Sequence, residues 1–154
     1  MIPEFKSLNA QEQNLMLNAP ILVTLLIAGA EGNIEKKEID WGAKIIHFKA
    51  EDKDAVLQNY CKEVDIIFND TMDNFIKSLP ENPEERGVKI NSELKKINNI
   101  LPKIDKKFAS TFYKGLKVLA VQVAKAAGGI WGYGSISPQE QKYIDLDVIN
   151  PPAD

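Results

Sequence analysis

The sequence predicts an all-α protein, a single-domain bundle of about seven helices, and three observations lead to this class. Apolar residues recur at three- and four-residue spacing along most of the chain, as the buried face of a helix requires. No useful stretch alternates polar and apolar residues as a half-buried strand does. The chain has 154 residues, of which 44% are hydrophobic and 27% charged, which suits one domain with its own core. We therefore expect a helical domain over residues 1–150 and a disordered tail over 151–154.

Glycines and prolines divide the chain into the expected helices. A short first helix is expected over residues 10–18, and a second begins at Pro20, whose missing N–H costs nothing in a first turn. The segment 20–30 contains one polar residue, so this helix should be buried on all sides, and the run is too short to cross a bilayer. Asn33 is expected to cap the third helix. The later helices are expected over residues 34–50, 54–79, 84–100, 103–127 and 138–149.

Charge and cysteine content exclude several classes of function. Residues 86–117 contain nine basic and two acidic residues, although the whole chain carries a net charge of −3. This basic segment either steers a partner or forms solvated helix faces. The acidic total and the lack of a recognition-helix signature argue against nucleic-acid binding. Cys61 is the only cysteine, so an internal disulfide and a cysteine-rich zinc site are excluded. No signal peptide or transmembrane segment is recognised, and we expect a cytoplasmic protein.

Two segments about one hundred residues apart share the same pattern of glycine, isoleucine and glutamate. Residues 27–38 read Ile-Ala-Gly-Ala-Glu-Gly-Asn-Ile-Glu-Lys-Lys-Glu, and residues 126–140 read Ala-Ala-Gly-Gly-Ile-Trp-Gly-Tyr-Gly-Ser-Ile-Ser-Pro-Gln-Glu. In each, a small-residue apolar stretch ends at glycine and an isoleucine follows. A glutamate then comes four residues after the isoleucine, at Glu38 in the first copy and Glu140 in the second. This repetition predicts a duplicated helix–turn–helix motif.

The first copy, at the end of an apolar helix and the start of a polar one, resembles the tellurite-resistance TerB-like family. That family's signature is an alanine-rich stretch, Asp-Gly, a branched apolar residue and a glutamate four residues on, occurring twice in an all-helical domain. The resemblance covers residues 20–50 and 116–149, with Glu31 where the family favours aspartate. The second copy lacks the acid before the glycine and has an apparent insertion at residues 128–134. The resemblance implies a non-enzymatic domain that binds a divalent cation or small ligand between its repeats in a stress response.

The acidic residues of the motifs are the candidate metal ligands. Glu35 and Glu38 are about one turn apart on one helix face, and Glu31 stands in the preceding turn. Symmetric packing of the two repeats would bring Glu140 near them. A cation would relieve the repulsion between these carboxylates, and oxygen ligands suit calcium, magnesium or manganese. The alternative is helix capping, with Ser137 and Glu140 as a capping box and the other glutamates stabilising a first turn.

The glycine-rich loop around Trp131 and Tyr133 is a candidate contact surface for protein partners. It lacks the lysine and the preceding strand of a phosphate-binding loop. His47 is the only histidine, and no catalytic triad is recognisable, so metal-assisted hydrolysis is the one enzymatic reading left. The sequence thus predicts a metal- or ligand-binding domain, with a ligand-free helical scaffold or adaptor as the alternative. Ligand, partner and oligomeric state do not follow from it.

Overall fold

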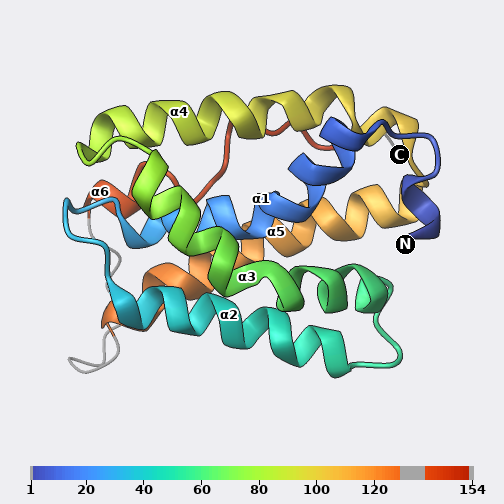
Figure 1. Ribbon diagram of the computed structural model, residues 1–154, viewed down its shortest axis with the longest axis horizontal. Coiled ribbons are helices and arrows are strands. Elements are labelled where there is room, and N and C mark those ends of the chain that lie inside the picture. The colour runs from blue at the N-terminus through green and yellow to red at the C-terminus, as the bar shows by residue number, and fades with distance from the viewer. Residues whose placement is uncertain (1, 129–137, 153–154) are drawn as a thin grey trace.

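A computed structural model describes residues 2–128 and 138–152 of the chain. Within these residues the protein is all-helical, as predicted, and has no strand. The helices form a bundle around α1, with α4 along one edge and α2 along the opposite one (Figure 1). The α-helices are α1 (Ala10–Ala28), α2 (Lys36–Glu51), α3 (Gln58–Ser78), α4 (Pro83–Lys95), α5 (Lys106–Gly128) and α6 (Pro138–Gln141). Short 3-10 helices are η1 (Pro3–Phe5), η2 (Lys96–Asn99) and η3 (Leu101–Lys103).

Helix α1 is the centre of the bundle and packs against α2, α3, α4 and α5. A capping box begins it: the Asn9 side chain accepts from the backbone N–H of Glu12, and the Glu12 carboxylate accepts from the Asn9 N–H. Every residue from Ala19 to Ala28 is buried. The prediction of a helix buried on all sides is confirmed for this half of α1.

The two helices expected on either side of residue 19 are one continuous helix, so that prediction was wrong. Pro20 lies inside α1 and cannot donate to the carbonyl oxygen of Met16, four residues earlier. The hydroxyl of Tyr60 on α3 donates to that oxygen instead. The Thr24 hydroxyl donates to the Pro20 carbonyl oxygen at 2.8 Å. A side chain from another helix therefore satisfies the carbonyl that the proline leaves without its helical donor.

Three other helix ends differ from the prediction for local reasons. Asn33 does not cap α2, because the Glu35 N–H bonds to the Ala28 carbonyl oxygen at 3.0 Å and keeps the chain extended to residue 35. Helix α3 begins at Gln58 because the Asp52 side chain accepts from a backbone N–H in the preceding turn. The helix expected over 84–100 ends as 3-10 turns, whose three-residue period keeps Leu94, Ile97 and Ile100 in the core.

The last helix is one turn long, where the sequence predicted residues 138–149. Ile144, Leu146 and Ile149 are all buried, and a helix would place the first two on opposite faces. Successive turns bury all three, and Leu146 adopts a left-handed conformation with φ of 48°. Residues 129–137 of the second motif lie outside the described residues, so the duplication stays a prediction. Nowhere in the described ranges is a helix both long enough and apolar enough to span a membrane.

Candidate functional site

The structure brings the two motif glutamates together. Glu38 lies in the first turn of α2 and Glu140 in α6, and a hydrogen bond joins their side chains. Their exposed fractions are 2% and 3%. Figure 1 shows α6 and the connection between α1 and α2 at the same end of the bundle. Two carboxyl groups more than one hundred residues apart in sequence thus meet inside the protein.

The four-residue spacing of small and apolar residues explains why Glu38 is buried. Glu38, Gly42, Ile46 and Ala50 follow one another on the same stripe of α2, and all four are buried. At Gly42 the helices come close, since an added Cβ would lie 2.7 Å from side-chain atoms of Thr24 on α1. The stripe that packs against α1 therefore carries the glutamate into the interior.

Burial dominates the electrostatics of this pair. It raises the pKa of Glu38 to about 9, helped by the hydrogen bond and negative charge of Glu140 and by the charges of Glu35 and Glu31. A hydrogen bond between two carboxyl groups requires a proton, so the pair holds one at neutral pH. The Oε2 atom of Glu38 is buried and has no hydrogen-bond partner among the described residues. The pair is therefore a buried acidic site that a proton or another cation must neutralise.

The other two candidate ligands lie nearer the surface. Glu35 is half-buried, precedes α2 and makes no side-chain capping bond. Glu31 is exposed and lines a cavity of about 220 Å³ together with Glu84 and Gln139, which neither member of the buried pair lines. The structure thus places these two carboxylates around the pair as sources of negative charge.

Three other residues of the sequence prediction cannot be placed. Trp131 and Tyr133 lie outside the described residues, as does Ser137, on which the capping-box alternative for Glu140 depends. The contact loop and that capping box therefore stay predictions.

Sequence reasoning missed Arg86, which holds the turn that carries the first motif. Its side chain is buried, and its Nη2 donates to the Gly29 carbonyl oxygen at 2.6 Å, at the end of α1. Its Nη1 donates to the Glu81 carbonyl oxygen at 3.1 Å. The positive guanidinium is favoured at the negative end of the helix dipole, although burial lowers its pKa. The available signal was that Arg86 is the only arginine in a lysine-rich sequence, since only arginine offers a fork of donors.

The remaining candidate reactive residues lie away from this pair. His47 lies on the surface, with Nδ1 2.9 Å from Asp65 Oδ2 and Nε2 3.0 Å from Glu51 Oε1, and these carboxylates raise its pKa. Cys61 is in the core, as the sequence predicted, and burial raises its pKa to about 11. At neutral pH it stays a thiol, which is a poor nucleophile.

A complete metal centre is not formed by the described side chains alone. Over residues 2–128 and 138–152, no three His, Cys, Asp or Glu side chains come together as a metal-binding group. The buried pair supplies two carboxyl groups, and a hard cation would complete its shell with water or carbonyl oxygens. Comparison with known protein families, curated proteins and solved structures found no match to this chain.

Proposed function

We propose that this protein is a non-enzymatic, TerB-like helical domain that binds a divalent cation between α2 and α6. Glu38 and Glu140 would supply the protein ligands, and Glu35 and Glu31 would add negative charge around them. The resemblance of the first motif to the TerB-like family supports a cytoplasmic stress-response setting. Magnesium, calcium and manganese are the candidate ions, because carboxylate oxygens are their preferred protein ligands.

The buried carboxyl pair is the observation that carries this proposal. Burying an unpaired carboxylate is strongly unfavourable, and two together are worse because their charges repel. Evolution can replace such a pair with apolar residues at little loss of stability. A pair that is 2% and 3% exposed, with one buried oxygen of Glu38 that accepts no hydrogen bond from the described residues, therefore favours a ligand role over a packing role.

The reactive groups elsewhere support a non-enzymatic reading. A general base must reach its substrate's proton, but both ring nitrogens of His47 contact carboxylates, one from Asp65 and one from Glu51. Cys61 is buried and held as the thiol. With His47 and Cys61 set aside, the hydrogen-bonded pair of Glu38 and Glu140 is the remaining candidate for a functional site.

Titration calorimetry with calcium, magnesium and manganese in turn tests the proposal. We expect the wild-type protein to bind at least one ion with a dissociation constant below 1 mM, a value that corresponds to about −4 kcal/mol. Glu38→Gln and Glu140→Gln keep the shape of the side chains but remove the charge, and each should weaken binding at least tenfold. Glu93→Gln, at an exposed position on α4, is the matched control and should bind as the wild type does. No heat from any ion at millimolar concentration would remove the binding claim.

The alternative function is a ligand-free scaffold or adaptor, and one finding favours it. No third acidic, histidine or cysteine side chain joins the buried pair within the part of the chain that the structure describes. A pull-down distinguishes the two functions. A scaffold predicts that Glu31→Ala and Glu38→Ala leave partner capture unchanged, whereas Trp131→Ala abolishes it.

A further inference from the structure

The outer side of α2 carries two large apolar residues that the bundle does not cover. Trp41 is 40% exposed and Phe48 is 66% exposed. Seven residues separate them, so they lie two turns apart on one face of the helix. On the neighbouring helix α5, Val118 is 52% exposed. Exposed apolar side chains that gather on one face, unlike scattered ones, mark a contact surface.

The packing of α2 against α5 brings these three residues together. Ile45 of α2 and Gly115 of α5 both line the seam between the two helices. Ile45 lies between Trp41 and Phe48 along the outer edge of α2, and Val118 follows Gly115 by one turn on the outer edge of α5. We call these four side chains the α2–α5 face, which consists of Trp41, Ile45, Phe48 and Val118.

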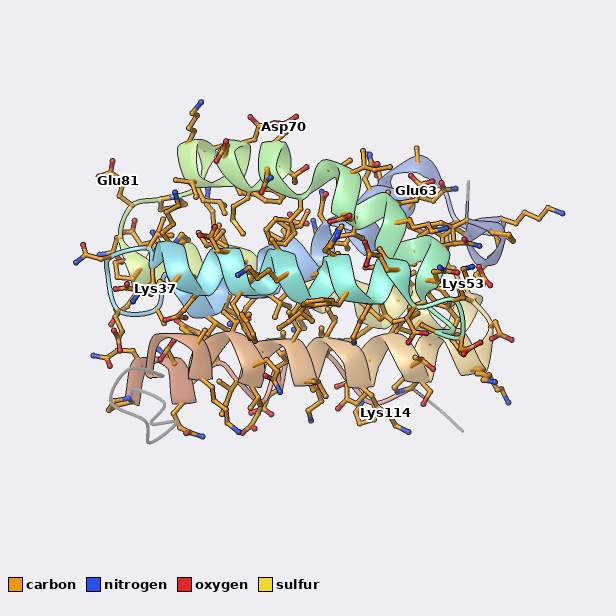
Figure 2. The ribbon with its side chains drawn as sticks, turned by 90° about the horizontal axis from the view of Figure 1, so that it is seen from below. Lys37, Lys53, Glu63, Asp70, Glu81 and Lys114 are labelled. Atoms are coloured by element: carbon orange, nitrogen blue, oxygen red, sulfur yellow. The ribbon has the colours of Figure 1, made fainter. Side chains whose placement is uncertain are left out.

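Positive charge surrounds this face. Helix α5 contains five lysines and no acidic residue, and Lys114 and Lys125 are exposed on its outer side. Lys37 and Lys44 are exposed on α2. Figure 2 shows the two helices side by side, with Lys37 on one and Lys114 on the other. The exposed acids of α2 are Asp40 and Glu51, and Glu51 is paired with the histidine one turn before it at 3.0 Å. Exposed lysines therefore outnumber exposed acids on these two helices.

The shape of the face decides between two kinds of anionic partner. A partner helix needs a groove to receive its apolar side chains. The opening at the seam has a volume of only about 20 Å³, which is room for about one water molecule. An anionic bilayer needs no groove, because aromatic rings enter the headgroup boundary while lysine stems extend to the lipid phosphates.

We propose that the α2–α5 face docks this protein on the surface of a bilayer rich in anionic lipid. Trp41 and Phe48 enter the boundary between headgroups and acyl chains, and Lys37, Lys44, Lys114 and Lys125 contact the headgroups. This docking does not depend on the cation site, because none of its residues belongs to that site.

Binding to phospholipid vesicles tests the proposal. The protein with Trp131→Phe keeps Trp41 as its only tryptophan, so its fluorescence reports on this face alone. Vesicles of phosphatidylcholine with one quarter phosphatidylglycerol should co-sediment the protein and shift its emission to the blue, whereas pure phosphatidylcholine should do neither. Lys44→Gln combined with Lys114→Gln should weaken binding about twenty-fivefold, at about fivefold for each charge near the surface. Trp41→Ser combined with Phe48→Ser, measured by co-sedimentation, should weaken it at least tenfold.

An exposed apolar residue elsewhere on the surface serves as the matched control. Ile66 on α3 is 78% exposed and lies outside the face, so Ile66→Ser should bind as the wild type does. Trp41, Lys44, Phe48, Ile66 and Lys114 are all exposed, and circular dichroism should show unchanged helix content for their variants. Absence of binding to the anionic vesicles at low salt, or equal loss with Ile66→Ser, would overturn the proposal. Dimerisation lost with Trp41→Ser and Phe48→Ser, or capture of an acidic helical peptide without vesicle binding, would assign the face to a protein partner and also overturn it.

Discussion

Replacing Glu38 by glutamine should remove much of the pH dependence of this protein's stability. The pKa of Glu38 is raised from its ordinary value of 4.5 to about 9 in the folded state. Between these two values the folded protein holds a proton that the unfolded chain releases. Its contribution to stability is therefore fully present below pH 4.5 and is lost as the pH rises towards 9. Glutamine fills the same space, donates to the neighbouring carboxylate and does not titrate.

The size of the effect follows from proton linkage. While the folded state holds one more proton than the unfolded state, each pH unit lowers the free energy of unfolding by about 1.4 kcal/mol. From pH 6 to pH 8 the wild-type protein should therefore lose up to about 3 kcal/mol. This is a large part of the roughly 5–15 kcal/mol that stabilises a typical domain, so denaturant midpoints should move visibly.

Urea unfolding at pH 6, 7 and 8 in the presence of a chelator measures this loss. The chelator is needed because any cation that binds only the folded state would add its own stabilisation. His47 titrates in the same direction, since Asp65 raises its pKa and the stability this pairing adds is lost as pH rises. Both proteins should therefore be compared in a His47→Gln background. Equal loss of stability in the Glu38→Gln variant and its parent, or a parent that gains stability with rising pH, would refute the reasoning.

Two further predictions concern the packing around α1. Tyr60→Phe removes the donor to the Met16 carbonyl oxygen and should lower the free energy of unfolding by about 1–3 kcal/mol. In a Pro20→Ala background, where a backbone N–H can serve that oxygen, the same substitution should cost less than half as much in a double-mutant cycle by urea unfolding; equal costs would contradict this account. Gly42→Ala places a methyl group 2.7 Å from Thr24 and should cost about 1–3 kcal/mol. Thermal unfolding measures this cost, Thr24→Ala should recover part of it, and an unchanged midpoint would contradict the close approach.

Local pattern was enough to predict the class of the fold and much of α1. The three- and four-residue spacing of apolar residues is present in α2, α3, α4 and α5, because a helix that packs on one side must repeat with that period. The unbroken apolar run after Pro20 predicted burial on all sides, and every residue from Ala19 to Ala28 is buried. The motif also singled out Glu38 and Glu140, since a glutamate four residues after a motif isoleucine is a pattern that the sequence displays directly.

The sequence-based predictions were wrong where a hydrogen-bond partner or a packing contact comes from a distant part of the chain. Pro20 was interpreted as a helix start because a missing N–H leaves no helical hydrogen bond unmade in a first turn. Inside a helix the carbonyl four residues earlier loses its donor, and here the Tyr60 hydroxyl of another helix replaces it. The turns after α6 read as a helix because spacing alone does not say that Ile144 and Leu146 are both buried. Arg86 looked like one of many basic surface residues, although its guanidinium is enclosed by backbone carbonyl groups.

The amino-acid sequence by itself thus determined that the chain is helical, which helix is central and which acids accompany the motif. The tertiary structure decided which of those acids is buried, what stabilises the helix through Pro20, and that the apolar residues of α2 and α5 share one exposed face. The physical reason is range: helical periodicity is set by neighbours within four residues. Hydrogen bonds of buried polar groups must be found wherever the fold brings a partner, as it does for Met16 with Tyr60, Gly29 with Arg86 and Glu38 with Glu140.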